Sequence, residues 1–512
     1  MDPTDDPTGH SEAENSPQVE RPLTPDKDGP IRNPSPPPDD VLSGVDKSLL
    51  EADTISNTVF SKHWVFSILM KLLKQVEDEQ EKKDDQGDAA QVHGIDIDEE
   101  LENDLCRLWD MSANVEVSKF LQEWKSPDIF LSVISKTNAP RITEICMGVL
   151  GNMACSPAIR QDFSKKQQLI DLSFALLSGS DSPTMVETSR LIYTCLNDEE
   201  CAPAWLETVK KDEEILKSII FILHSSTNCD LIHNVADLLD QLLDLDDNLL
   251  QSWSGPALIQ AISEALNQVS RDKPNTVSLL LHSLQVISTT SSGIDSLVEV
   301  SEKIMPLLTG FISGVFEDRV LAMRGRENTL ASVVSVLSTM VLQSQDAVKS
   351  LAQKDSRTVK QLAEMLYVTH HKKSSREDSS YRRRHSSSNE STDRRRSSSR
   401  SEGQEGQEGE ERKGETEKEE QKEERNEEKD KKEKEEEEEE EEEDPEAVWL
   451  TELLKEHLVE FFCCALEISK KNTAFWEKLH SCGGVRLEAV RECLPTDRND
   501  LSEAMELIQA KK

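Results

Sequence analysis

The sequence predicts an all-α protein, an α-solenoid of the armadillo/HEAT-like kind. Apolar residues repeat with the spacing of one buried helix face in segments that start at Ile142, Met185, Leu231, Val277 and Leu330. The offsets between these segments are about 43, 46, 46 and 53 residues, which is typical of HEAT and armadillo repeats. Aromatic residues make up only 4% of the chain, which favours stacked aliphatic helices over sheets. A plain helical bundle is the alternative, and the nearly constant offset argues against it.

The composition limits both the folded fraction and the partners. Of the 512 residues, 36% are hydrophobic, and the formal net charge of −41 lies mostly in the first 50 residues, in 77–104 and after residue 400. Such a surface repels phosphate, so we expect no nucleic-acid partner. No apolar N-terminal run and no apolar stretch of about 18 residues occurs, so neither a secretory signal nor a membrane segment is expected. The ten scattered cysteines predict a reducing compartment.

Residues 1–52 are predicted to be a disordered, acidic, Pro-rich tail, because this composition cannot bury enough apolar surface to offset the entropy of ordering. Three positions in the tail precede a proline and are candidate phosphorylation sites: Ser16, Thr24 and Ser35.

Residues 56–371 are predicted to form the solenoid. Its first helix is expected over 61–76 with Ser61 as the N-cap, followed by an acidic loop at about 77–98. Helices around 101–112 and 114–124 would then complete a capping layer. Prolines at 127, 140, 183 and 274 fit first helical turns. The later stripes contain Leu231, Val235, Leu238, Leu239 and Leu242; Val277, Leu280, Leu281, Leu284 and Ile287; and Leu330, Val333, Val334, Leu337 and Val341.

Residues 372–445 are predicted to be a disordered linker, first rich in Arg and Ser and then acidic, with a coiled-coil-like run of glutamates over 435–443. Its basic part is a candidate bipartite nuclear-localisation signal for an importin; a solvated charged linker is the alternative. The signal would consist of Lys372, Lys373, Arg382, Arg383, Arg384, Arg394, Arg395 and Arg396. Ser386 and Ser398 follow arginines and are candidate phosphorylation sites that would reduce the local positive charge.

Residues 446–512 again have helical periodicity. We expect an apolar face with Trp449, Leu453, Leu454, His457, Leu458, Phe461 and Phe462, which could add the last layer of the stack.

Several segments resemble known proteins. The stretch GVLGNMA at 148–154 resembles the third helix of an armadillo repeat, and SKHWVFSIL, LCRLWDMS, FLQEWKSPDIF, PRITEICMGVLGNMAC and VETSRLIYTCL together resemble the serum amyloid A-like proteins. This resemblance covers about residues 56–255 and weakens afterwards. It implies an intracellular, largely nuclear armadillo-like protein linked to cell proliferation, including that of fibroblasts, with no assigned enzymatic activity.

The third helices supply the candidate partner groove, whose expected residues are Glu144, Asn152, Glu187, Arg190, Asp237, Asp240 and Gln241. Import receptors of the armadillo type clamp a basic peptide with a Trp and an Asn one turn apart. Here the residue one turn before Asn152 is Gly148, and the corresponding pairs in the next two units are Leu191 with Cys195 and Asp237 with Gln241. The repeated clamp is therefore missing.

No catalytic motif of a phosphate-binding loop, serine hydrolase, zinc protease or dinucleotide-binding enzyme occurs in the sequence. Cys463, Cys464, His480, Cys482 and Cys493 lack the paired spacing of a zinc site, so no metal or cofactor is expected. The sequence thus predicts a non-enzymatic interaction scaffold in the nucleus, with the cytoplasm as a second location and an unidentified protein partner. A nucleocytoplasmic transport or cargo adaptor is the alternative function.

Overall fold

The computed structural model describes residues 53–86, 97–269, 273–316, 323–353, 357–371, 445–468 and 473–495. These residues are helical apart from turns and a single isolated bridge between Thr54 and Ser61, so the prediction of an all-α solenoid is confirmed. The chain divides into two compact units, Met1–Val65 and Phe66–Lys512. The predicted tail 1–52 and almost all of the predicted linker 372–445 lie outside the described residues.

In the first unit, Asp53 and Ser61 organise the start of α2 (Lys62–Gln86). The Ser61 hydroxyl donates to the Asp53 carboxylate and accepts the backbone N–H of Trp64 at 3.1 Å. Asp53 also accepts the N–H of His63 at 3.0 Å. Two backbone donors at the exposed helix end are thereby satisfied, which supports Ser61 as the expected cap.

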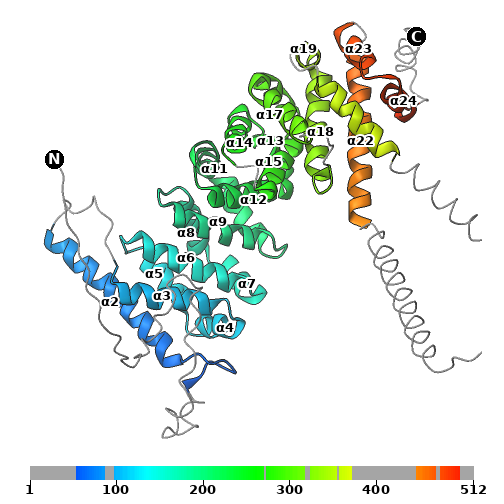
Figure 1. Ribbon diagram of the computed structural model, residues 1–512. Helices are drawn as coiled ribbons and strands as arrows, with labels where there is room; N and C mark the ends of the chain where they lie inside the picture. Colours follow the sequence, from blue (N-terminus) through cyan, green and yellow to red (C-terminus); the bar gives the residue numbers. More distant parts are fainter. Residues whose placement is uncertain are drawn as a thin grey trace, which may run out of the picture. The chain divides into compact units, whose positions relative to one another are not determined.

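The second unit is a succession of three-helix layers, so corresponding helices form three rows (Figure 1). The first row contains α4 (Val115–Glu123), α7 (Pro157–Ser164), α10 (Ala202–Lys211), α13 (Asp247–Trp253), α16 (Ser291–Glu299) and α19 (Gln345–Gln353). The second row contains α5 (Ser126–Ile134), α8 (Gln167–Leu177), α11 (Glu213–Ser225), α14 (Pro256–Gln268) and α17 (Ser301–Gly314). The third row contains α3 (Glu99–Ser112), α6 (Pro140–Ala154), α9 (Ser182–Leu196), α12 (Cys229–Leu245), α15 (Pro274–Ile287), α18 (Glu327–Gln343) and α22 (Pro445–Ile468).

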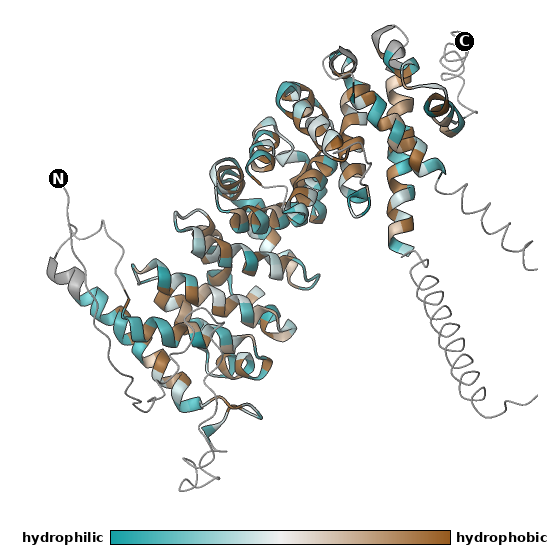
Figure 2. Cartoon of the chain, viewed as in Figure 1, coloured by the Kyte–Doolittle hydropathy of each residue, from teal (hydrophilic) through white to brown (hydrophobic). Residues whose placement is uncertain are grey.

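The third row is continuous: α3 packs on α6, α6 on α9, and so on through α12, α15 and α18 to α22. All members of the predicted stripes on α12, α15 and α18 are buried, as are Ile142 on α6 and Met185 on α9, where the first two stripes begin. Figure 2 shows hydrophobic and hydrophilic residues sharing nearly every helix, as expected where each helix buries one face. Pro in the first turn of α5, α6, α9 and α15 matches the predicted starts.

The first helix is longer than predicted. It continues to Gln86, ten residues into the segment expected to be an acidic loop. The reason is Glu79, whose side chain is almost completely buried and accepts from the Thr137 hydroxyl at 2.9 Å and the Asn138 N–H at 3.1 Å. Gln80 adds a bond to the carbonyl of Lys136 at 2.6 Å. The turn between α5 and α6 therefore holds this part of α2, a contact that local charge does not reveal.

Near the C-terminus, α22 packs along α18, α23 (Thr473–His480) packs on α19, and α24 (Gly484–Cys493) contacts both α22 and α23. Leu454, Leu458, Phe461 and Phe462 on α22 are fully buried. Trp449 was expected on the same apolar face, but its side chain is 61% exposed. It lies in the second turn of α22, and its apolar surface remains in contact with solvent.

Candidate functional site

The seven predicted groove residues lie on three successive third-row helices. Glu144 and Asn152 are on α6, Glu187 and Arg190 on α9, and the remaining three on α12. All seven are half-buried. The structure connects several of them to neighbouring helices through hydrogen bonds, so much of the expected binding surface braces the stack.

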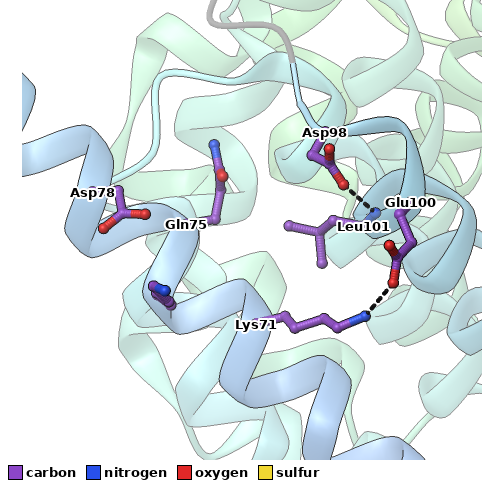
Figure 3. Close-up of a pocket in the computed structure, with 7 residues that line it drawn as sticks. Lys71, Gln75, Asp78, Asp98, Glu100 and Leu101 are labelled. Carbon is purple, nitrogen blue, oxygen red and sulfur yellow. Dashed lines mark hydrogen bonds and ion pairs between the residues drawn. The ribbon is translucent and has the colours of Figure 1, made fainter.

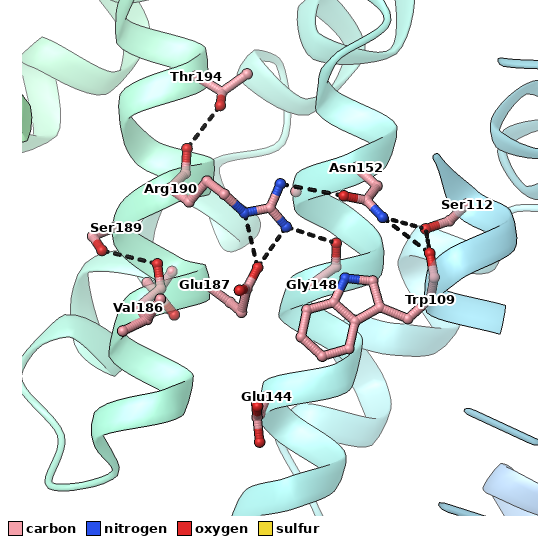
Figure 4. Close-up of polar contacts among 12 residues, drawn as sticks. Trp109, Ser112, Glu144, Gly148, Asn152, Val186, Glu187, Ser189, Arg190 and Thr194 are labelled. Atoms are coloured by element: carbon pink, nitrogen blue, oxygen red, sulfur yellow. Dashed lines mark hydrogen bonds and ion pairs between the residues drawn. The ribbon is translucent and has the colours of Figure 1, made fainter. Parts of the chain in front are cut away.

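Asn152 is at the centre of this network (Figure 4). Its side-chain amide donates to the carbonyl of Trp109 at 3.0 Å and to the Ser112 hydroxyl at 3.1 Å, both on α3. Its oxygen accepts from Arg190 Nη1 at 3.2 Å. Both amide protons and one oxygen lone pair are used within the protein. Asn152 thus joins three layers and has no free donor for a peptide backbone.

Arg190 continues the network from α9 to α6. Its Nη2 donates to the carbonyl of Gly148 at 3.2 Å, and its Nε donates to Glu187 at 2.9 Å. A side chain at residue 151 would approach the guanidinium, because Arg190 Nη2 lies 2.8 Å from the position of an added Cβ. The two groove residues on α9 therefore act together as a brace between layers.

Trp109 belongs to the same surface but was not among the predicted groove residues. Its indole lies against Gly148, with Cε2 only 2.1 Å from the position that a Cβ at residue 148 would occupy. The ring is half-buried and covers Gly148, the residue one turn before Asn152. The sequence does contain an indication of this contact. Trp109 lies about one repeat before Gly148, which has no side chain to occupy the space that the indole fills. This tryptophan and Asn152 lie on different helices, so the spacing of a clamp within one helix does not reveal them.

On α12, Asp240 is engaged with α15. Its carboxylate accepts from His282 Nδ1 at 2.8 Å and from the Ser283 hydroxyl at 3.0 Å. The hydrogen bond to Asp240 raises the pKa of His282 against the opposing effect of burial. The imidazolium is therefore favoured beside this carboxylate.

Asp237 is less completely paired. Its carboxylate lies 3.6 Å from His233 Nε2, and burial raises the pKa of the Asp237 carboxyl. The pKa of Tyr193 on α9 is raised by burial and then by the charges of Asp237 and Asp240. Gln241 and the exposed Asp244 make no hydrogen bond or ion pair with the described part of the chain. Asp237, Gln241 and Asp244 share one face of α12 through their three- and four-residue spacing.

Glu144 lies at the other end of the predicted groove. It pairs with Arg141 at 2.7 Å, and Arg141 also donates to Glu102 on α3 at 2.8 Å. Its charge is thus compensated within α6. α12 carries four aspartates and no Lys or Arg, so its acidic charge is not compensated within the helix.

Two depressions on the described part of the surface are lined by charged and polar residues. The first, of about 230 Å³, lies between α2 and α3 (Figure 3). Lys71 lines this depression and forms ion pairs with Glu100 at 2.9 Å and Asp104 at 3.0 Å, so the charge of this lysine is compensated. The second, of about 360 Å³, is lined by Asp128, Leu131, Ser132, Ser135, Lys136 and Gln168.

The described residues contain no group of three His, Cys, Asp or Glu side chains placed to hold a metal ion. Burial raises the pKa of Cys146 to about 12 and that of Cys482 to about 11, so both thiols remain protonated. In the same part of the chain, no single helix has the length and apolar character to cross a bilayer. The bent pair α6 and α7 meets that criterion only jointly.

The predicted nuclear-localisation residues Lys372 to Arg396 lie outside the described residues, as do the phosphorylation candidates Ser16, Thr24, Ser35, Ser386 and Ser398. They stay predictions from the sequence.

Comparison with known proteins places the chain in a family. Residues 215–500 match the SAAL1 C-terminal domain, which is more than half of the chain. The chain belongs to the SAAL1 family. SAAL1 stands for serum amyloid A-like 1, so the resemblance found in the sequence is confirmed. The SAAL1 domain match extends to residue 500, well beyond the 56–255 range on which the resemblance was based.

Individual SAAL1 proteins agree with this assignment. The chain is 37% identical to protein SAAL1 of Homo sapiens over 334 residues, covering 60% of this chain and 70% of the human protein. It is 40% identical to protein saal1 of Danio rerio over 280 residues, covering 52% of this chain and 58% of the zebrafish protein. Protein saal1 of Xenopus tropicalis is 36% identical over 335 residues, with 60% and 71% covered. The match thus spans less than two thirds of the zebrafish relative.

Proposed function

We propose that this SAAL1-family chain is a non-enzymatic protein-interaction scaffold that supports cell proliferation, including that of fibroblasts. A protein partner would bind along the third-row face of the solenoid. The all-helical fold and the SAAL1 family, which are not known enzyme types, support a non-enzymatic role. The resemblance to proliferation-associated proteins is the basis for the cellular role.

One observation supports α12 as the part of the third-row face that binds the partner. Asn152, Glu187 and Arg190 on α6 and α9 are used to brace neighbouring layers. On α12, Gln241 and Asp244 form no hydrogen bond or ion pair within the described residues, and Asp237 only approaches His233, at 3.6 Å. Two of these three are carboxylates, so a segment with Lys or Arg would gain favourable electrostatic contact. This argues for a partner that offers a basic extended segment to α12.

A transport or cargo adaptor is the second candidate. The position of the Trp109 indole over Gly148 favours it, since a tryptophan and an asparagine lie side by side at one point of the row. The complete use of the Asn152 amide argues against it, because the clamp needs that amide for the cargo backbone. The scaffold is therefore our leading proposal.

We further propose a nuclear location through importin binding to the basic cluster. Replacing Arg382–Arg384 and Arg394–Arg396 with alanine should move a fluorescent fusion of the full chain out of the nucleus. An unchanged nuclear signal would remove this part of the proposal.

The binding surface can be tested by charge reversal. The variant D237K/D244K should lose the partners that the full chain captures from fibroblast extract, and should fail to restore growth in fibroblasts depleted of the protein. The matched control D171K/E213K makes the same change of charge at exposed positions on α8 and α11. Equal capture by both variants, with both folded by circular dichroism, would exclude the α12 face as the partner site.

A further inference from the structure

The seam between α12 and α15 contains two histidines that bond across it. His282 on α15 donates from Nδ1 to Asp240 on α12, with 2.8 Å and 3.0 Å to the two carboxylate oxygens. His233 on α12 lies 3.1 Å, through its own Nδ1, from the Thr276 hydroxyl on α15. These contacts lie two turns apart and hold the same two helices together.

The charges around His282 favour its protonated form. Asp240 and Asp244 are the charged groups that act on the ring, and both belong to α12. The helices α14 and α18 also pack against α15, and within the described residues neither adds a charged group that acts on His282. Asp237 lies one turn from Asp240 on the same side of α12. Two carboxylates of α12 therefore act on one imidazole.

The position of Asp240 makes this interaction stronger than a surface ion pair. Its side chain is only 18% exposed, and Ser283 donates a second hydrogen bond at 3.0 Å that fixes the carboxylate. A hydrogen bond from a charged donor to a carboxylate is about twice as strong as one from a neutral donor. When His282 loses its proton, its hydrogen bond to Asp240 comes from a neutral donor and is weaker. The negative charge of the α12 carboxylates then no longer faces a positive imidazolium.

We propose that His282 is a proton-controlled clasp between the α12 and α15 layers, closed when the imidazole is protonated and loosened when it is neutral. The pKa of His282, raised above its ordinary value of 6.5, moves the transition toward neutral pH. Loosening would affect the layer of α12, which carries Asp237, Asp240 and Asp244, and the neighbouring layer of α15. The inference stands on the geometry of this seam and does not depend on the proposed function.

Hydrogen exchange on the full chain tests the clasp. We expect the amides of α15 to lose protection by about two- to fivefold between pH 6.0 and 8.5, as expected for one partly exposed ion pair. The exchange rates are first corrected for the intrinsic pH dependence of exchange. The variant H282Q keeps an amide donor toward Asp240 but cannot titrate, so its protection should not change with pH. The control H224Q replaces an exposed histidine on α11 and should retain the wild-type pH dependence.

An NMR titration of histidine Cε1–H resonances provides a second measurement on the unmodified chain. The His282 resonance is identified as the one that is missing from the spectrum of H282Q. If H282Q does not fold, it is identified as the one that shifts in D240N. Its pKa should lie above 6.5 and fall in D240N. A value at or below that of an exposed histidine, or the same pH dependence of protection in wild type and H282Q, would overturn the proposal.

Discussion

Gly148 shows how one missing side chain can determine the contact between two layers. Its open position on α6 receives the Trp109 indole from α3, while the neighbouring Asn152 bonds to the carbonyl of the same tryptophan. Packing and hydrogen bonding thus act at the same place. The sequence alone indicates only that Gly148 stands where a peptide clamp would have a tryptophan.

Replacing Gly148 with alanine should destabilise the protein by about 1–3 kcal/mol, because overpacking would displace the buried part of the indole. The urea midpoint measured by tryptophan fluorescence would report this. The matched control is G310A in α17, where no atom lies within 4 Å of the new Cβ. That change should be neutral or stabilise by about 0.5–1 kcal/mol through helix propensity. Equal effects of the two variants would contradict the packing role of Trp109.

The pair Arg160 and Asp198 should make stability dependent on acid pH. Arg160 donates to Asp198 at 2.7 Å and to the carbonyl of Ala154 at 2.9 Å, and its hydrogen bonds hold the pKa of Asp198 below the ordinary 3.8. The stabilisation is present above pH 3.8 and is lost as the pH falls through the lowered value. Urea unfolding should show R160Q less stable than wild type at pH 7, with the difference shrinking in acid.

The exposed pair Lys165 and Asp162 offers the control for that experiment. Its side chains are 73% and 47% exposed, so K165Q should change stability little at any pH. A difference between R160Q and wild type that stays constant down to acid pH would show that Asp198 does not carry the effect.

At the level of whole helices, α2 shows that a highly charged segment can belong to the folded stack. The prediction ended this helix at residue 76 because the following residues are mostly acidic and polar. The structure buries Glu79 and uses its carboxylate to bind the turn before α6, whose N-cap residue Ala139 has no side-chain cap. Glu79 is buried because it accepts hydrogen bonds from the donors of that turn, which would otherwise lack a partner. The turn lies about 58 residues away in the chain.

The variant E79A should therefore destabilise the chain by about 1–3 kcal/mol, since it leaves buried donors without a partner. Hydrogen exchange should show early loss of protection at the start of α6 and along 77–86. The control E81A changes an exposed glutamate two residues later and should leave both segments protected. Similar exchange in E79A and wild type would show that the turn does not depend on this carboxylate.

Across the whole molecule, the third row joins helices from distant parts of the chain. α22 follows α18 in this row although more than 100 residues separate their starts. The buried Leu454, Leu458, Phe461 and Phe462 supply the apolar contact. Burying such side chains contributes about 1.5–3 kcal/mol each, so this helix should stay bound without a covalent connection.

A specific protease site inserted between residues 400 and 440 can test this. After cleavage, the two fragments should elute together in size-exclusion chromatography. Adding F461D should separate them, because a carboxylate would be buried without a partner. W449D changes an exposed residue of the same helix and should leave the fragments associated. Separation of the unsubstituted fragments would contradict packing of α22 on the stack.

The sequence alone determined the class of fold, the position of most helices and the family. Helix periodicity, first-turn prolines and a repeat of roughly 45 residues are local properties, so they can be recognised without knowing any long-range contact. The tertiary structure decided which polar residues brace the stack and which face solvent. Asn152, Arg190 and Asp240 have the same local pattern as a groove lining, but their partners lie about 40 residues away and meet them only when the layers stack.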